Sequence, residues 1–380
     1  MDFRLSDEEL LWRKQVIELI EREKTPELFR ESVIEYTFGP HTWEFLGKLG
    51  ERGWLAPALP KEYGGIGASP LQRFILLEEL SYRVGYTPPV GVSIVGPTLL
   101  SYGSQEQKSE YLPPIARGEI EFALGYTEPE AGSDLASLQM RAVPMDDHYV
   151  ISGQKVFNTR CHFAQYHWLG ARTDPTVAKH RGISLFIVDL KSPGITINPL
   201  ITMSGWRTNA VFYDEVKVPR SNLVGEENKG WYYMRIALEH ERTITTGNAR
   251  WTFERLVEYV KQGHPVNPVL QHKLAEAAIE LEVASLLGLR VSWRQSRGTP
   301  TPYEASEVKV FVSELEQRII YLGMEILGLY GALRADSKRA PLDGIMEFLY
   351  RGIPQLTLVR GTSEVQRNII ALRGLGLPPD

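Results

Sequence analysis

Residues 124–159 read LGYTEPEAGSDLASLQMRAVPMDDHYVISGQKVFNT, and the rest of the chain can be placed around this stretch. Just before and into it, residues 120–127 alternate in the manner of a β-strand. Pro129 then ends the strand, and Gly132 permits a tight turn. The threonine and serine hydroxyls around that glycine suit an electron-rich ring edge or a phosphate. A turn that binds nothing uses the same residue types.

The composition sets broad limits on the class of protein. At 380 residues and 43% hydrophobic, the chain can bury a large core and is expected to form two or three domains. A net charge of −5 without a long basic run argues against nucleic acid as a partner. The single cysteine, Cys161, excludes an intrachain disulfide and fits a reducing compartment. With neither a signal peptide nor an apolar run long enough to span a bilayer, we expect a cytoplasmic protein.

The pattern of the chain changes twice. Helical spacing follows a capping box at Ser6 and Glu9 and predicts an all-α N-terminal domain over residues 1–118. Alternating segments separated by turns then predict an antiparallel β domain over residues 119–228.

Long amphipathic runs return after this β domain and predict a C-terminal four-helix bundle over residues 229–380. In that bundle, Thr301, Pro302 and Glu304 read as the cap, first-turn proline and capping glutamate of one long helix. The fold class is therefore α+β.

Two further blocks follow the first turn in register. Residues 153–159 read GQKVFNT, and residues 360–371 read RGTSEVQRNIIA. Together with TEPEAGSD, these blocks resemble the signatures of the acyl-CoA dehydrogenase family, T-E-P-x-A-G-S-D, G-x-K-x-[WF]-x-T and G-T-S-x-x-Q-R. The resemblance covers nearly the whole chain. It implies an FAD-dependent flavoprotein with a β domain between two helical domains, assembled as a homo-oligomer, either a dimer or a tetramer.

The resemblance also implies which residues meet the cofactor. Thr127 and Thr159 would bind the flavin ring edge, Ser133 would bind a phosphate oxygen, and Phe157 would flank the ring where the family often has Trp. The full implied set of cofactor residues is Leu124, Tyr126, Thr127, Gly132, Ser133, Phe157, Thr159, Glu325, Thr362 and Glu364. Ser133 and Arg242 are also the implied substrate-binding residues. No metal site is implied.

Two departures concern FAD binding across a subunit interface. Many members carry R-x-x-F-G before the first long bundle helix, whereas residues 262–268 read QGHPVNP, without Arg or Phe. Glu325 stands where Gln is common.

The position of the catalytic base is the main chemical question. Many members have Glu directly before the C-terminal Gly-Thr, where this chain has Arg360, and an arginine cannot accept a proton near neutral pH. The family offers a second position, a Glu before an Arg early in the C-terminal domain, which Glu241 and Arg242 match. Glu241 is therefore the implied base, although such charged runs commonly form a solvated helix face. The backbone N–H of Arg360 would keep the role of binding the thioester carbonyl.

These assignments predict an acyl-CoA dehydrogenase of lipid metabolism. It would introduce an α,β double bond into an acyl-CoA or other acyl thioester and pass electrons to an electron-transfer flavoprotein. Three alternatives stay open: a subunit of a heteromeric enzyme like those that degrade steroid side chains, a flavin oxidase or monooxygenase of the same fold, and a dehydrogenase acting on carrier-protein thioesters. The chain length and branching of the acyl group do not follow from the sequence.

Overall fold

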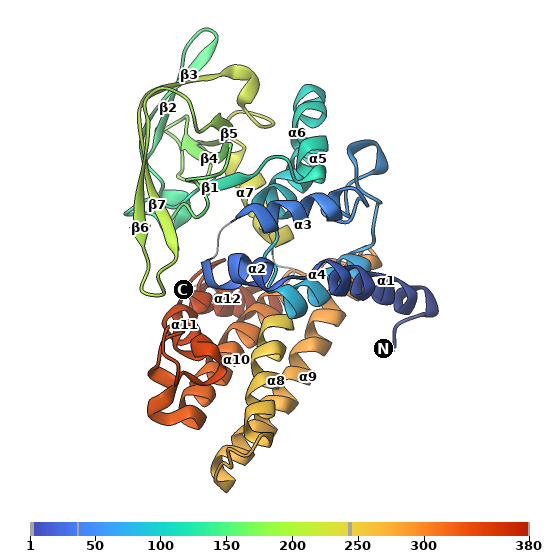
Figure 1. Ribbon diagram of the computed structural model, residues 1–380. Coiled ribbons are helices and arrows are strands. Elements are labelled where there is room, and N and C mark those ends of the chain that lie inside the picture. Colours follow the sequence, from blue (N-terminus) through green and yellow to red (C-terminus); the bar gives the residue numbers. More distant parts are fainter. Residues whose placement is uncertain (1–3, 36–37, 242–244, 379–380) are drawn as a thin grey trace. The chain divides into compact units, whose positions relative to one another are not determined.

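A computed structural model describes residues 4–35, 38–241 and 245–378, and only the backbone of residues 237–241. The chain forms two units (Figure 1). The sheet unit comprises residues 36–68 and 88–241, and the helical unit comprises residues 1–35, 69–87 and 242–380. The N-terminal helices are thus divided between the two units.

The sheet unit is built on seven strands. Their bounds are β1 Phe122–Gly125, β2 Arg141–Pro144, β3 His148–Lys155, β4 Tyr166–Arg172, β5 Ile183–Asp189, β6 Ile195–Ile201 and β7 Arg207–Pro219. The strand order is β1-β4-β2-β3-β7-β6, with β5 paired to β4. Neighbours are antiparallel except where β4 meets β1 and β2. This sheet confirms a β domain in the middle of the chain, but it is mixed and not wholly antiparallel as predicted, because β4 runs parallel to β1 and β2.

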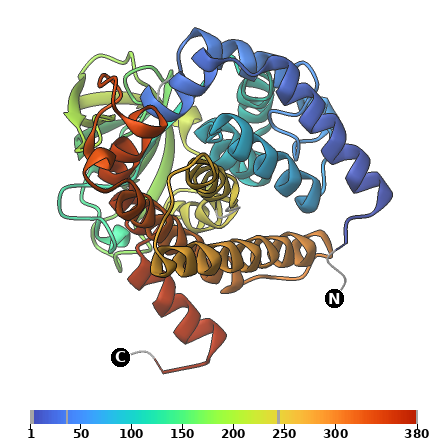
Figure 2. The ribbon, with the colours of Figure 1, turned by 60° about the horizontal axis from the view of Figure 1, so that its bottom comes forward.

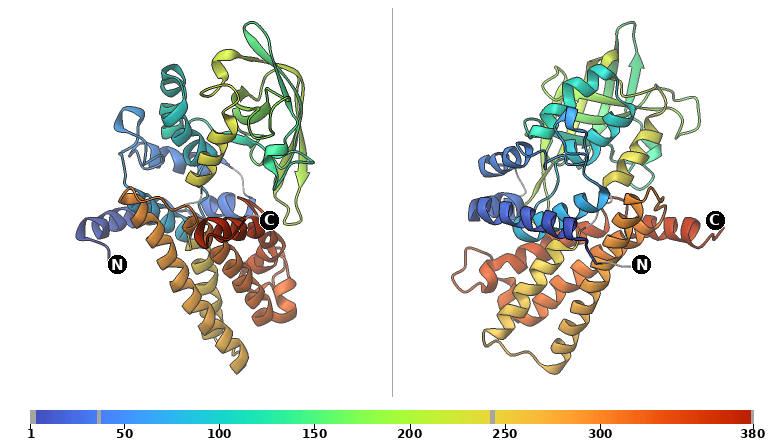
Figure 3. Two further views of the ribbon diagram at one scale, coloured as in Figure 1. Left: turned by 180° about the vertical axis from the view of Figure 1, so that it is seen from behind. Right: turned by 90° about the vertical axis from the view of Figure 1, so that its right-hand side faces the viewer.

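Burial explains why these segments are strands. Strand β5 is apolar and buried almost throughout, as expected of a strand covered on both faces, whereas β6 is largely exposed. Figure 3 shows β6 and β7 as the long ribbon along one side of the sheet. The other elements of this unit are α3 Pro40–Gly50, η2 Lys61–Tyr63, η3 Gly91–Val95, α5 Gly96–Tyr102, α6 Gln105–Arg117, η4 Leu135–Ser137, η5 Arg220–Asn222 and α7 Gly230–Glu241. Phe122 and Trp168 anchor the core between these helices and the sheet.

The helical unit contains the long helices. Their bounds are α1 Asp7–Glu23, α2 Pro26–Phe29, α4 Pro70–Val84, α8 Gly247–Lys261, α9 Pro268–Ser296, α10 Glu304–Leu327, α11 Ile345–Gly352 and α12 Ser363–Ile369. Short turns complete the unit: η1 Arg30–Glu35, η6 Gly328–Ala332, η7 Pro341–Gly344, η8 Ile353–Thr357 and η9 Ile370–Gly374. Helices α8, α9 and α10 pack on one another, and α4 packs on α8 and α9 (Figure 2). None of the helices in the described residues is long and apolar enough to cross a membrane.

Helix starts follow the predicted caps in one case and not in another. Ser6 and Glu9 form the predicted capping box of α1. The cap predicted at Thr301 is wrong, because α10 begins at Glu304 after Tyr303, whose side chain makes no capping bond. The Glu304 carboxylate is buried and accepts a hydrogen bond from Arg294 of α9 instead. Helix–helix packing thus uses the carboxylate that the sequence pattern assigns to a cap.

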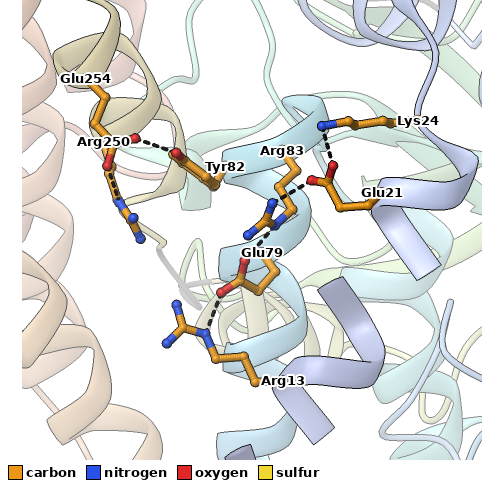
Figure 4. Close-up of polar contacts among 8 residues, drawn as sticks. All are labelled: Arg13, Glu21, Lys24, Glu79, Tyr82, Arg83, Arg250 and Glu254. Carbon is orange, nitrogen blue, oxygen red and sulfur yellow. Dashed lines mark hydrogen bonds and ion pairs between the residues drawn. The ribbon is translucent and has the colours of Figure 1, made fainter. Parts of the chain in front are cut away.

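A polar network ties the N-terminal helices to α8 (Figure 4). The buried carboxylate of Glu79 accepts hydrogen bonds from Arg13 of α1 at 2.6 Å and from Arg83 at 2.9 Å. On the neighbouring face of α4, Tyr82 donates to Glu254 of α8, which also pairs with Arg250. Helix α4 is therefore linked by charged groups to α1, which precedes it, and to α8, which follows the sheet unit in the sequence.

The start of α8 is fixed by the same helix. Glu78 of α4 accepts hydrogen bonds from the backbone N–H of Thr246 at 2.8 Å and from its hydroxyl at 2.6 Å. Burial raises the pKa of Glu78, and the two Thr246 donors oppose that rise. A Cβ added to Gly247 would lie 2.4 Å from the backbone nitrogen of Tyr82, so only glycine allows the two helices to approach this closely.

Candidate active site

The ends of β1 and β3 bring the first two sequence blocks together. Beyond these strands, the backbone N–H of Val156 donates to the carbonyl of Thr127 at 2.9 Å. Strand β1 ends at Gly125, two residues earlier than the sequence pattern suggests, because the chain turns toward this bond. Tyr126 is buried, and its hydroxyl accepts a hydrogen bond from Trp168 at 2.9 Å.

Thr127 carries two donors that have no partner within the described part of the chain. Its side chain is half-buried, and neither its backbone N–H nor its hydroxyl has a hydrogen-bond partner among the residues that the structure describes. Buried or half-buried backbone donors are nearly always paired with protein or water. An acceptor from a ligand would satisfy both groups.

Phe157 presents an apolar ring at the surface of the sheet unit. Its side chain is 67% exposed, and its φ of +56° is unusual for a bulky residue. Two residues on, the hydroxyl of Thr159 lies 3.2 Å from that of Thr208 on β7. A strained, exposed aromatic ring beside a held hydroxyl is typical of a site that meets a flat ligand.

Gly132 and Ser133 lie on the exposed turn after β1. Gly132 does not have a positive φ, and a Cβ added to it would meet no atom within 4 Å. Neither the backbone conformation nor a neighbouring group therefore requires glycine here. The open space beside Gly132 and the exposed Ser133 hydroxyl fit the approach of a phosphate group. Leu124 is the remaining member of this set and is half-buried in β1.

Two buried charges lie beneath this turn. The ammonium of Lys155 donates to the Tyr126 carbonyl at 3.1 Å and to Glu128 at 2.8 Å. Desolvation lowers the pKa of Lys155 to about 8, although Glu128 opposes the shift. Nearby on β4, burial together with Lys155 lowers the pKa of His167 to about 3, so its imidazole is neutral.

Arg172 binds the carbonyls of residues 136, 138 and 179 and so holds the segment that follows the turn.

The third sequence block starts α12 of the helical unit. Arg360 and Gly361 have φ values of +60° and +82°, and Thr362 caps the helix by accepting the N–H of Val365 at 3.2 Å. Glu364 is exposed in the first turn, where its own backbone N–H and the Thr362 hydroxyl lower its pKa.

Buried polar side chains hold this loop from two sides. Gln366 is fully buried and donates to the Arg360 carbonyl at 3.0 Å. On α10, Lys309 is buried and donates to the Thr357 carbonyl at 3.3 Å. The backbone around Arg360 is therefore fixed by groups that the sequence reasoning did not assign.

The remaining predicted residues lie elsewhere. Glu325 is exposed near the end of α10 and pairs with Lys273 of α9 at 2.6 Å. Lys309, the residue of α10 that binds the Thr357 carbonyl, lies about 24 Å away from Glu325 along the helix axis, at 1.5 Å per residue. Glu241 is the last residue of α7, and its side chain lies outside the described residues, as does all of Arg242.

The residues of the sheet unit fit an isoalloxazine ring and its phosphates. They supply unused donors at Thr127, an exposed aromatic at Phe157 and open space at Gly132. Across the part of the chain that is described, no group of three His, Cys, Asp or Glu side chains lies together as metal ligands would. Cys161 is buried, and burial raises the pKa of its thiol to about 12, so it is unreactive near neutral pH.

Comparison with known proteins gives the family. Profiles of the acyl-CoA dehydrogenase family match in three consecutive parts, the N-terminal domain at residues 6–119, the middle domain at residues 123–216 and the C-terminal domain at residues 228–375. The acyl-CoA dehydrogenase FadE26 of Mycobacterium tuberculosis is 38% identical over 359 residues, covering 90% of each chain.

Two solved structures resemble the whole chain. One is described as the Tcur3481-Tcur3483 steroid ACAD, with a TM-score of 0.93, and the other is the ChsE4-ChsE5 complex from Mycobacterium tuberculosis, with a TM-score of 0.91. Each is 36% identical, and each match covers 100% of both chains.

A β domain between N- and C-terminal helical domains, matched in this order by the three family profiles, defines a flavoprotein dehydrogenase. The chain belongs to the acyl-CoA dehydrogenase family. It is therefore an FAD-dependent oxidoreductase that acts on CH–CH bonds, as the sequence blocks predicted.

Proposed function

We propose that the protein introduces an α,β double bond into an acyl-CoA, with Glu241 as the base that removes the α proton. The observation that carries this proposal is the set of unused donors and exposed aromatic surface at Thr127 and Phe157, which suits bound FAD. Glu241 ends α7, one residue before Arg242, in the order of the family's alternative base. Arg360 stands at the other base position and cannot accept the proton.

The roles of the sheet-unit residues follow from what each offers. The N–H and hydroxyl of Thr127 and the hydroxyl of Thr159 would bind the flavin ring edge, Phe157 would cover the ring, and Ser133 would bind a phosphate and contact substrate. Leu124, Tyr126 and Gly132 would shape the cradle. In the helical unit, Thr362 and Glu364 would approach the flavin, Glu325 would serve a neighbouring subunit's FAD, and Arg242 would support the substrate.

Bound FAD supplies the acceptor for the hydride that leaves the β carbon. The chain's own task is to hold the α proton within reach of the Glu241 carboxylate and to stabilise the charge that develops on the thioester oxygen. The N–H of Arg360 is the proposed donor to that oxygen. Gln366 donates to the Arg360 carbonyl and so fixes the loop that carries this N–H. Electrons would leave to an electron-transfer flavoprotein in the cytoplasm.

The test of the base is Glu241→Gln. Removing the single positioned base should lower the rate of anaerobic flavin bleaching by an acyl-CoA on the order of 10²–10⁴-fold while FAD stays bound. Glu239→Gln, two residues away on the same helix, is the matched control and should bleach at the parent rate. Equal bleaching by Glu241→Gln and the parent would assign the base to another residue.

A second candidate is that this chain is one subunit of a heteromeric acyl-CoA dehydrogenase acting on steroid side chains. Two observations favour it: both similar structures are described as pairs of proteins, one of them a steroid ACAD, and residues 262–268 lack the Arg and Phe that members use across the interface. The C-terminal segment also exposes Leu372, Leu375 and Leu377, and it extends beyond the other helices of its unit, whereas α12 itself packs on α10 (Figure 2).

Purification of the chain alone separates the candidates. A homo-oligomer, dimer or tetramer, with stoichiometric FAD and acyl-CoA-dependent bleaching supports the first, whereas a chain that gains FAD and activity only with a second subunit supports the other. Oxygen consumption during turnover would instead indicate an oxidase or monooxygenase. Activity confined to carrier-protein thioesters would indicate a dehydrogenase that acts on carrier-bound acyl groups.

We also propose domain boundaries near residues 118 and 228, which the ends of the three family profiles support.

A further inference from the structure

The peptide group between Tyr126 and Thr127 is held from one side by a buried charge. The Lys155 ammonium is fully buried and lies 3.1 Å from the Tyr126 carbonyl oxygen. In a planar trans peptide, the carbonyl and the following N–H point in opposite directions. The N–H of Thr127 therefore points away from Lys155, toward the side on which it has no partner among the described residues.

The next peptide group is held by the next residue. The N–H of Val156 donates to the Thr127 carbonyl at 2.9 Å. Lys155, the last residue of β3, and Val156, which follows it, thus bind the carbonyls of Tyr126 and Thr127. This arrangement fixes the backbone of Thr127, whose N–H and hydroxyl have no partner among the residues that the structure describes.

Glu128 extends the same anchor to the far end of the turn. One of its carboxylate oxygens accepts the N–H of Met140 at 2.9 Å as well as the Lys155 ammonium, and the other accepts the N–H of Gln139 at 2.5 Å. Both ends of the turn that carries Gly132 and Ser133 are therefore attached to one buried ion pair.

Stability alone does not account for this pair. Burying two charges costs several kcal/mol of desolvation per ion, and apolar residues of similar volume often replace such a pair with no loss of stability. Desolvation accordingly lowers the pKa of Lys155. What an apolar pair cannot supply is a donor to the Tyr126 carbonyl at a defined position.

We propose that Lys155, paired with Glu128, is a positioning residue for FAD. It holds the Tyr126–Thr127 peptide and the following turn so that the free donors of Thr127 and the Ser133 hydroxyl stand ready for the flavin ring edge and a phosphate. This inference rests on the proposed placement of Thr127 at the flavin.

The test uses variants that remove the charges together. Lys155→Met alone would leave Glu128 buried and unpaired, so the variant of choice is Lys155→Met with Glu128→Gln. We expect the FAD-free variant to stay folded, with its urea unfolding shifted only by the lost donor to the Tyr126 carbonyl. We also expect a Kd for FAD raised on the order of tenfold and a changed absorption spectrum of the bound flavin, as for other supporting residues behind a bound group. Lys155→Gln with Glu128→Gln keeps a neutral donor and should recover part of the affinity.

The control is Glu121→Gln, which removes an equally buried carboxylate of the sheet unit that pairs with Arg160 instead. It should leave the Kd for FAD and the flavin spectrum unchanged. Hydrogen exchange of the Val156 N–H in FAD-free protein gives a second readout, which should be faster in the Met/Gln variant and unchanged in the control.

Parent-like FAD affinity, spectrum and Val156 exchange in the Met/Gln variant would overturn the inference. A parent chain that binds no FAD, alone or with a second subunit, would count against the proposed function. The Val156 exchange would then still decide whether Lys155 fixes the Thr127 turn.

Discussion

Gln366 occupies the space that a side chain at Gly361 would need. A Cβ added to Gly361 would lie 2.4 Å from the amide nitrogen of Gln366, which donates to the Arg360 carbonyl. Gly361 also has a φ of +82°, a conformation that costs other residues about 1–2 kcal/mol. Both constraints act on the loop that presents the backbone of Arg360.

Gly361→Ala should therefore lower the free energy of unfolding by about 2–4 kcal/mol, the sum of the backbone cost and the displacement of Gln366. Gly298→Ala is the matched control, because Gly298 has a φ of +68° in the same unit but open space around it. Urea unfolding of both variants measures the difference. Equal losses would show that Gln366 yields to the added methyl group without cost.

A swap of the base tests whether positions 241 and 360 serve one α carbon. Glu241→Gly should be nearly inactive, and adding Arg360→Glu should restore part of the activity, because a carboxylate returns at the family's other base position. The measurement is anaerobic flavin bleaching by an acyl-CoA. A double variant that folds, holds FAD and binds acyl-CoA without recovery would contradict the proposed active site.

Glu121 makes the stability of the sheet unit depend on pH. Burial raises its pKa to about 7, although Arg160 opposes the rise, and one carboxylate oxygen has no hydrogen-bond partner within the described residues. The folded state therefore binds more protons than the unfolded state between pH 4.5 and 7, and stability falls as pH rises through this range.

Glu121→Gln removes this titration. Relative to the parent, the variant should gain roughly 1–3 kcal/mol of stability between pH 5 and pH 8, whatever its stability at pH 5. Urea unfolding at four pH values across this range gives the difference directly. A difference that does not change with pH would mean that Glu121 is already ionised at pH 5.

Thr246→Val tests the anchor between α4 and α8. The variant loses the hydroxyl that donates to Glu78 at 2.6 Å and should cost about 1–3 kcal/mol, because a half-buried carboxylate oxygen loses its partner. Thr246→Ser keeps the hydroxyl and should lose much less. Thermal unfolding compares the two, and similar losses would attribute the effect to the lost methyl group.

The local elements of the fold could be predicted because they depend on neighbouring residues. Ser6 and Glu9 lie within one helical turn of each other and together specify the start of α1. Thr127 and Phe157 lie in sequence blocks whose spacing matches the family. The division of the N-terminal helices between two units could not be predicted. It depends on contacts such as that of Tyr82 with Glu254, which are distant in sequence.

The supporting residues of the site were missed for a related reason. A lysine such as Lys155 at the end of a strand ordinarily faces solvent, and only the packed structure shows that it is buried on Glu128. Gln366 lies in a block that was recognised, yet its bond to Arg360 depends on how the chain turns at Gly361.

The assembly of the helical unit from three separate segments has a consequence for synthesis on the ribosome. Glu78 binds Thr246, which follows it by 168 residues in the sequence. At a synthesis rate of 5–20 residues per second, Thr246 is made roughly 10–30 s after Glu78. The larger segment of the sheet unit, residues 88–241, emerges within that interval. Helix α1 can pack on α4 at once, but the face of α4 that packs on α8 and α9 must wait uncovered. The nascent chain is therefore most exposed to aggregation while its first segments are already made.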